Sequence, residues 1–257
     1  MHSSINNEVR SSHHSGNFSN HLSTEKLKEH RTTDTTELHN RTNVNLSNEF
    51  DVHRVYDTFI ASLREPNNPK SPIGTQDYID GYRELLKFFD QLGYIFKFVK
   101  DDVVDKLGIL QSFVDKDKKG TTHFNTIQKA IDYETEQNLI KTNPQNFTRT
   151  LLRLHRALLF LIEFLGGLAD RPLSENTATI ATHCYDATLY NYHGFLIRQS
   201  VKLGFLMLPS RRQLDEVIFH GHKTELFEQY KTFIKIIKQI YDTIQSFYAE
   251  KKYLQLP

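Results

Sequence analysis

Apolar side chains recur every third or fourth position along most of the chain after about residue 50, which is the period of a helix that buries one face. Two long runs follow this period: Tyr78, Tyr82, Leu85, Phe89, Leu92, Phe96 and Val99, and Leu226, Tyr230, Phe233, Ile237, Ile240, Ile244 and Phe247. Prolines stand only at positions 66, 69, 72, 144, 172, 209 and 257, outside these runs. No alternating apolar and polar run with hairpin turns stands out. The pattern predicts an all-α fold.

Helix boundaries follow from capping and helix-breaking residues. The expected helical segments are 52–63, 78–99, 103–114, 123–140, 147–165, 174–208 and a final helix from about Lys223. Gly166 and Gly167 are expected to end the fifth segment, and Ser174 is expected to cap the sixth. Together with a short segment after Pro209, the sequence predicts about eight helices in one domain over residues 50–257.

Residues 1–49 have a different composition, rich in Ser, Thr, Asn and His and poor in large apolar side chains. Such a segment buries too little surface to offset its ordering entropy. We expect a disordered polar tail there. Its histidines, such as His13 and His14, could hold a metal weakly, but a solvated tail is the simpler interpretation.

Three arginines interrupt the most apolar helix of the sequence. Arg149, Arg153 and Arg156 lie within about 60° of one another on one helical stripe. A guanidinium keeps its proton and is costly to bury alone, so three on one face need an anion. Within the helix only Glu163 is acidic, which favours a phosphate-binding stripe. The alternative is a stripe that faces water or pairs with acidic side chains elsewhere.

The overall composition narrows the function classes. The 257 residues carry 32 Lys and Arg against 31 Asp and Glu, and this balance argues against a nucleic-acid binder. A single cysteine, Cys184, excludes a disulfide within the chain. We see neither a signal peptide nor an apolar run long enough to span a membrane, so we expect a cytoplasmic protein. No metal-ligand cluster, phosphate-binding glycine loop or nucleophile elbow is present, so we expect no enzyme, metal or cofactor.

Two further positions carry candidate chemistry. Asp102 and Lys106 are four residues apart and share a helix face, where the simple interpretation is an exposed ion pair of about 0.3–0.5 kcal/mol. His193 lies in the aromatic stretch Leu189–Ile197, where a satisfied core histidine is the commoner role. One carboxylate, one imidazole and several cations suit recognition of a ligand better than bond-making.

Several motifs together resemble the glycolipid transfer protein family, most closely its ceramide-1-phosphate-binding branch. The similar runs are Lys100–Leu107, Arg149–Leu158, Tyr185–His193 and the C-terminal Tyr248–Pro257. The resemblance covers about residues 50–257 and implies a two-layer helical sandwich whose apolar interior takes up the chains of a sphingolipid. It further implies that Asp102 accepts hydrogen bonds from the ceramide amide N–H and the sphingoid hydroxyl. His193 would donate to the amide carbonyl.

The same resemblance assigns the cations. It places Lys106, Arg149 and Arg153 on the lipid phosphate and Arg156 on a further basic position near it. Sugar-binding relatives carry Asn where Lys106 stands and Trp where Arg153 stands, and this chain has no tryptophan. A phosphate monoester of charge about −1.5 to −2 suits the Lys and Arg cluster instead.

The function implied by the resemblance is non-vesicular transfer of ceramide-1-phosphate between membranes, by a monomer that touches membrane surfaces transiently. Residues near the portal that could contact the membrane are Ile95, Phe96, Phe98, Val99 and Phe195. For each of these, ordinary core packing is the alternative. Three other functions stay open: a sphingolipid sensor or adaptor that binds without shuttling, a glycolipid transfer protein, and a phosphoesterase.

Overall fold

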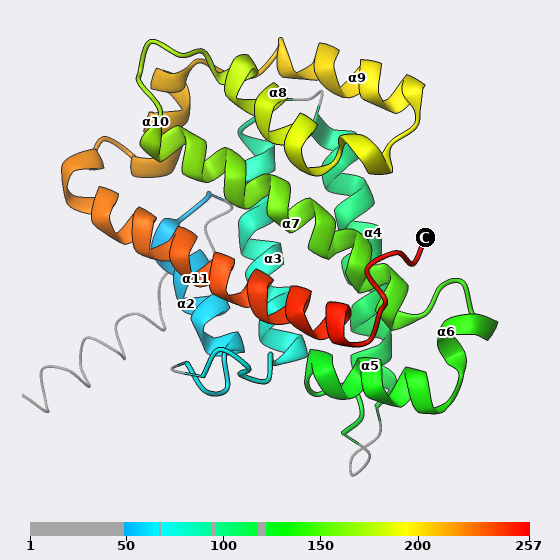
Figure 1. Cartoon of the computed structure of the whole chain (residues 1–257). Coiled ribbons are helices and arrows are strands. Elements are labelled where there is room, and N and C mark those ends of the chain that lie inside the picture. The colour runs from blue at the N-terminus through cyan, green and yellow to red at the C-terminus, as the bar shows by residue number, and fades with distance from the viewer. Residues whose placement is uncertain (1–48, 67, 94–95, 118–121) are drawn as a thin grey trace, which may run out of the picture. The chain divides into compact units, whose positions relative to one another are not determined.

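The computed structural model describes residues 49–66, 68–93, 96–117 and 122–257 (Figure 1). The helices of these residues are α2 (Val52–Ser62), α3 (Thr75–Asp90), α4 (Lys97–Lys116), α5 (Ile127–Glu136), α6 (Leu139–Thr142), α7 (Phe147–Asp170), α8 (Thr177–Thr188), the 3-10 helix η2 (Tyr190–Tyr192), α9 (Phe195–Phe205), α10 (Arg211–Phe219) and α11 (Lys223–Glu250). The predicted all-α class is confirmed, with ten α-helices in the described part where about eight were expected. Apart from Glu49, the expected polar tail lies outside the described residues.

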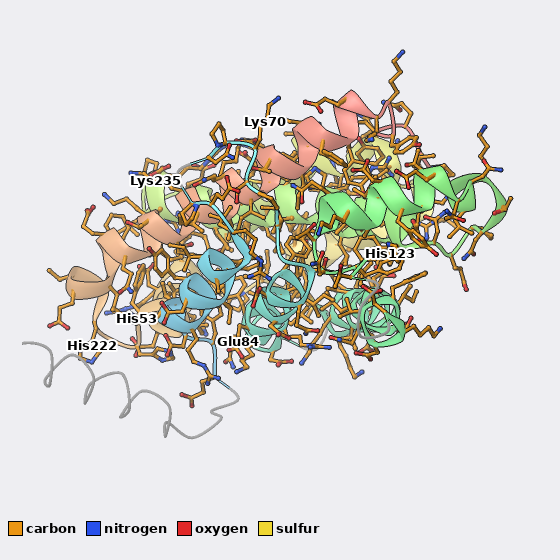
Figure 2. All side chains as sticks on the ribbon, turned by 90° about the horizontal axis from the view of Figure 1, so that it is seen from below. His53, Lys70, Glu84, His123, His222 and Lys235 are labelled. Carbon is orange, nitrogen blue, oxygen red and sulfur yellow. The ribbon has the colours of Figure 1, made fainter. Side chains whose placement is uncertain are left out.

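The described helices form two layers around one hydrophobic core. Figures 1 and 2 show α7, α8 and α11 on one side of α2, α3 and α4, and the two views agree. The helix that joins the layers is α7, which packs against α4 and α5 as well as α8 and α11. Leu151, Leu154, Leu158 and Leu165 on α7 are fully buried. Their burial confirms the prediction that this helix lies in the interior.

The start of α7 is fixed by side chains that satisfy its free backbone N–H groups. Asn146 caps the helix and accepts from the amide of Arg149 at 2.7 Å. The buried carboxylate of Glu134 accepts from the amides of Phe147 and Thr148 at 2.7 and 2.8 Å, and from the Thr148 hydroxyl. The positive end of a helix favours such an anion. These contacts fix where the arginine stripe begins.

The end of α7 differs from the prediction. Gly166 and Gly167 do not end the helix, which continues to Asp170. A Cβ atom built on Gly167 would lie 2.8 Å from the Cγ2 atom of Ile180 in α8. Gly167 is therefore explained by close packing of two helices, and it keeps the helical conformation.

Two other boundaries were also predicted wrongly. The run expected as one helix over 78–99 breaks between α3 and α4, where Gly93 has a φ of +96° that side-chain-bearing residues rarely adopt. The segment expected over 123–140 starts only at Ile127 and divides at Asn138, which has a φ of +56°. Local left-handed residues, which apolar spacing does not reveal, separate helices that face the same core.

The segment expected as one helix over 174–208 consists of α8, η2 and α9. Its N-cap is Asn176, whose side chain accepts from the amide of Thr179 at 2.9 Å, so the choice of Ser174 was wrong. The chain leaves the helical conformation between η2 and α9, and Gly194, which is extended, directly precedes α9. This break matters for function because it lies beside His193.

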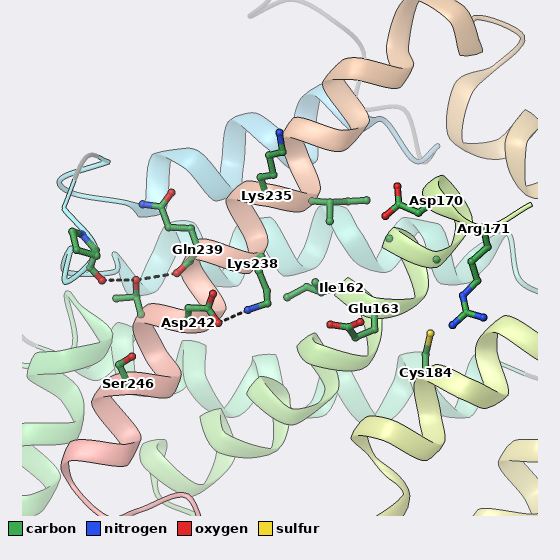
Figure 3. Close-up of a pocket in the computed structure, with 15 residues that line it drawn as sticks. Ile162, Glu163, Asp170, Arg171, Cys184, Lys235, Lys238, Gln239, Asp242 and Ser246 are labelled. Carbon is green, nitrogen blue, oxygen red and sulfur yellow. Dashed lines mark hydrogen bonds and ion pairs between the residues drawn. The ribbon is translucent and has the colours of Figure 1, made fainter.

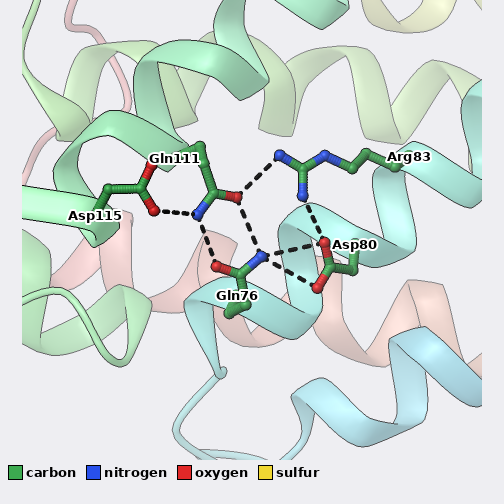
Figure 4. A network of polar contacts seen from close by, with 5 residues as sticks. All are labelled: Gln76, Asp80, Arg83, Gln111 and Asp115. Atoms are coloured by element: carbon green, nitrogen blue, oxygen red, sulfur yellow. Dashed lines mark hydrogen bonds and ion pairs between the residues drawn. The ribbon is translucent and has the colours of Figure 1, made fainter.

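A polar network ties α3 to α4 (Figure 4). Gln76 and Gln111 exchange hydrogen bonds of 3.1 and 2.8 Å through their amide groups. Arg83 donates to both Asp80, at 2.7 Å, and Gln111, at 2.9 Å, while Gln111 donates to Asp115. Networks of this kind fix the relative position of two elements. Here the network positions α4, which carries two of the predicted site residues.

His155 of α7 is a titratable group enclosed by the core. It is 1% exposed, its Nε2 atom lies 2.8 Å from the Oε1 atom of Gln245, and its ring stacks on Tyr241. Burial, with a smaller contribution from the charge of Arg156, lowers the pKa of His155 to about 4, although the contact with Gln245 opposes the shift. The folded protein therefore binds this proton more weakly than the unfolded chain does.

Stability should consequently fall in acid. The contribution of His155 is intact above pH 6.5 and is lost as the pH falls toward 4. The loss amounts to about 3 kcal/mol of unfolding free energy. We expect His155→Gln to be less stable at neutral pH but to lack this part of the pH dependence in urea unfolding from pH 7 to 4. The exposed-site control His183→Gln should follow the unmodified protein, and equal slopes for all three would contradict the assignment.

Candidate functional site

A cavity of about 850 Å³ lies among α3, α4, α7, α8 and α9, a volume typical of small-molecule sites. Aromatic rings form much of its wall. Phe96, Phe205, Phe160 and Phe164 follow one another with centroids 5.9–6.5 Å apart and nearly parallel planes. The interior therefore offers apolar contact and few hydrogen-bonding groups.

Charged and polar side chains gather at the same cavity. Five of the six predicted binding residues line it: Asp102, Lys106, Arg153, Arg156 and His193. They come from α4, from α7 and from the connection between η2 and α9, so separate stretches of sequence converge on one opening. The carboxylate of Asp102 and the side chain of Arg153 are exposed, which places them at the mouth.

Arg149 is the predicted binding residue that does not line the cavity. It lies in the first turn of α7, is half-buried, and donates from Nε to the carbonyl of Ile140 at 3.2 Å. It precedes Arg153 by four residues, so both occupy the same face of the helix. Arg149 thus contributes positive charge beside the mouth.

Asp102 and Lys106 form the ion pair expected from their spacing. The Nζ atom of Lys106 contacts an Oδ1 atom of Asp102 one helical turn away. The Lys106 side chain is 18% exposed and that of Asp102 is 65% exposed. Because the carboxylate of this pair is open to solvent, the ion pair contributes little stability, and a ligand could separate the two groups at small cost.

The arginine stripe has no acidic partner in the described part of the chain. No Asp or Glu side chain there lies within 4.0 Å of the guanidinium nitrogens of Arg149, Arg153 or Arg156. Their described hydrogen-bond acceptors are backbone oxygens, and Arg156 also lies over the Tyr192 ring. Acidic side chains of the described residues therefore do not neutralise the stripe, as one alternative required, and its three positive charges have no Asp or Glu within ion-pair distance.

A second hollow of about 760 Å³ lies between α7 and α11 (Figure 3). Its charged lining residues are Glu163, Asp170, Asp242, Arg171, Lys235 and Lys238. Acids and bases are equal in number, and Lys238 pairs with Asp242. Balanced charge gives this hollow no preference for an anion, and it includes none of the predicted binding residues.

His193 is held by Tyr185. The Tyr185 hydroxyl lies 2.8 Å from the Nδ1 atom of His193. Burial, helped by Arg198 and opposed by Asp102, lowers the pKa of His193, so the imidazole is neutral near pH 7. If the hydroxyl donates to Nδ1, the single imidazole hydrogen stands on Nε2. That arrangement leaves one N–H donor for a ligand.

The candidate membrane residues separate into distinct groups. Phe98 and Phe195 are 53% and 71% exposed, while Val99 is half-buried and lines the cavity. The expectation was wrong for Phe96, which is buried in the row of phenyl rings. Ile95 lies outside the described residues.

An exposed apolar surface at α9, called here the apolar face of α9, is not predicted from the sequence. Phe195, Leu196 and Leu203 on α9, and Leu206 and Met207 just after its end, are 65–79% exposed. Contiguous exposed apolar groups mark interaction surfaces. The spacing of these residues is visible in the sequence, but their direction is not, because the run 174–208 reads as one long helix and the break before α9 sets which side faces outward. None of the described helices has the length and apolar character needed to cross a bilayer.

Comparisons with known proteins agree with this geometry. The model of the family described as glycolipid transfer protein matches residues 73–219. The ceramide-1-phosphate transfer protein of Danio rerio is 32% identical over 217 residues, covering 82% of this chain and 100% of that protein. The Mus musculus protein of the same name is 32% identical over 205 residues, covering 77% and 94%.

Solved structures give the same result. The crystal structure of mouse ceramide-1-phosphate transfer protein in its apo form is similar with a TM-score of 0.75 and 33% identity, covering 81% of this chain and 100% of that one. The human protein in complex with 12:0 ceramide-1-phosphate gives a TM-score of 0.74 and 30% identity with the same coverage. The chain belongs to the glycolipid transfer protein family.

Proposed function

We propose that this protein moves ceramide-1-phosphate between membranes without vesicles. The observation that carries the proposal is the convergence of Lys106 and the arginine stripe, which has no acidic partner in the described residues, at the mouth of an apolar cavity. Only a ligand with an anionic head and long apolar chains satisfies both environments. Relatives named for this lipid, at 32% identity, support the same assignment.

The phosphate would be held by Lys106, Arg149 and Arg153. A phosphate monoester carries about −1.5 to −2 charges and three acceptor oxygens, which match guanidinium and ammonium donors. Binding would separate Lys106 from Asp102. The freed carboxylate would accept from the ceramide amide N–H and the sphingoid hydroxyl, while the Nε2–H group of His193 donates to the amide carbonyl.

The cavity explains why a protein is needed for transfer. Exposing a lipid chain to water costs about 0.8 kcal/mol for each CH₂ group, so a two-chain lipid leaves a membrane very slowly. If the lipid chains passed directly from the membrane into the cavity lined by the phenyl rings, they would avoid most of this exposure to water. The free-energy barrier to leaving the membrane would therefore be lower. The net direction of transfer would follow the lipid gradient.

Membrane contact would use the apolar face of α9 together with Phe98. Arg198 and Lys202 on the same helix add positive charge near this face, although Lys202 pairs with Asp186 and Arg198 lies over the Tyr190 ring. Docking would be reversible and superficial, because a few apolar side chains enter only the boundary region of the bilayer. We therefore propose a cytoplasmic monomer that associates peripherally with membranes.

Arg153→Leu should reduce vesicle-to-vesicle transfer of fluorescent ceramide-1-phosphate by about tenfold or more, since a hydrogen bond to a charged group is worth about 1.5–3 kcal/mol. Circular dichroism should show unchanged helix content. The matched control is Arg212→Leu on α10, an exposed arginine outside the cavity, which should transfer normally. Normal transfer by the Arg153 variant would refute the phosphate assignment. Lipid binding without transfer by the unmodified protein would indicate a sensor.

Tyr185→Phe should remove the group that fixes the tautomer of His193. We expect the ¹⁵N shifts of the His193 ring to indicate hydrogen on Nε2 in the unmodified protein and a mixture of tautomers in the variant. Transfer should fall about tenfold through the loss of one oriented donor. Hydrogen on Nδ1 in the unmodified protein would contradict the proposed role of His193.

Leu203→Glu should weaken sedimentation with anionic vesicles and slow transfer, because it places a charge in the apolar face of α9. Uptake of a short-chain, water-dispersed ceramide-1-phosphate should stay unchanged. The control Leu173→Glu changes a side chain of similar exposure, 67% against 65%, away from α9, and it should bind vesicles normally. Equal loss of vesicle binding in both variants would argue against a docking role for α9.

A further inference from the structure

Arg156 differs from the other cations at the mouth because its guanidinium makes two short hydrogen bonds to backbone carbonyls of one segment. A single nitrogen, Nη2, donates to the carbonyl of Leu254 at 2.8 Å and to that of Leu256 at 2.9 Å. Its Nε atom is buried without a partner, so a ligand oxygen could reach it only if neighbouring groups moved. By contrast, the contact of Arg153 with the Pro257 oxygen is long, at 3.5 Å.

The carbonyls that Arg156 holds belong to the segment Tyr253–Pro257, which we name the strap. The strap is not helical, and it is anchored where α11 ends: the Tyr253 amide donates to the carbonyl of Tyr248 at 2.9 Å, and the Tyr253 hydroxyl donates to the Thr135 hydroxyl at 3.2 Å. Beyond Tyr253, Gln255, Leu256 and Pro257 line the cavity. The far half of the strap is therefore a wall of the mouth, and Arg156 is its strongest described attachment to α7.

Arg156 also touches the opposite wall. Its guanidinium carbon lies 4.1 Å from the ring centroid of Tyr192, a distance suited to a cation–π contact. Tyr192 lines the cavity and directly precedes His193. One side chain thus joins the strap to the turn that presents the imidazole.

We propose that Arg156 is a positioning residue: it clamps the strap Tyr253–Pro257 and the Tyr192–His193 turn together across the mouth of the lipid cavity. The phosphate is left to Lys106, Arg149 and Arg153, whose described contacts are weaker or easier to exchange. This inference rests on the proposed function, because the mouth it shapes is the one assigned to the lipid head group.

The clamp can be tested without lipid through hydrogen exchange of the Leu256 amide, which donates to the Tyr253 carbonyl at 3.1 Å. Arg156→Gln removes both charge-assisted bonds, so exchange of this amide should rise about tenfold or more. The matched variant Arg153→Gln, from the same stripe, should change it by less than about threefold. Unchanged exchange in Arg156→Gln would overturn the proposal whichever lipid the protein binds.

A second experiment separates positioning from direct phosphate contact. Binding of vesicles that contain ceramide-1-phosphate, or the same ceramide without phosphate, is measured for Arg156→Gln, for a deletion of Leu254–Pro257 and for the double variant. A clamp predicts that Arg156→Gln costs less affinity in the deletion background than in the full chain, because only its contact with Tyr192 is left to lose, and that both lipids lose affinity by a similar factor.

Direct contact between Arg156 and the phosphate predicts a different result. If Arg156→Gln costs as much in the deletion background as in the full chain, and costs more for the phosphorylated lipid, then Arg156 is a phosphate ligand and the proposal is wrong. Failure of the unmodified protein to bind either lipid would refute the proposed function instead. The exchange experiment would then still decide the role of Arg156.

Discussion

A guanidinium group keeps its charge under all physiological conditions, so every arginine on a buried helix needs an anion, a carbonyl or water. This constraint shapes α7. The leucine face of the helix joins the two layers, while its arginine stripe turns toward the cavity mouth. In the described residues the stripe contacts backbone oxygens and the Tyr192 ring, and no Asp or Glu side chain. A helix that organises the core therefore also presents a positive site next to an apolar interior.

The apolar cavity and the charged rim beside it would select two different parts of a ligand, its chains and its head group. The cavity accepts apolar chains with little regard to their head group, because dispersion and hydrophobic burial are not directional. In the proposed function the rim would recognise charge and hydrogen-bonding pattern, with Asp102 and His193, which line the same cavity, meeting the amide linkage. The Gln76–Gln111 network keeps the rim in place by fixing α4 against α3. Selectivity thus depends on helices that pack rigidly outside the site.

Much of this could be predicted from the sequence. The period of the apolar positions indicated an all-α fold, and the spacing of three arginines on one stripe of α7 indicated an anion site. Contacts between distant positions could not be predicted in this way. The attachment of Arg156 to Leu254 and Leu256 joins positions about one hundred residues apart, and no local pattern records it. The burial of Phe96 likewise depends on Phe205, which belongs to another helix.

The wrongly predicted helix breaks have a common cause that bears on function. Apolar spacing reports which side chains are shielded from water, and cavity walls are shielded as well as the core, so the spacing continues across the breaks before α4 and α9. Both breaks border the cavity. A continuous helix through Gly194 would run on along the axis of α8, whereas the break lets α9 return against α8 and leaves His193 at the corner. The break before α9 therefore stands where the chain brings His193 to the site, whereas Asp102 and Lys106 reach it from within the regular helix α4.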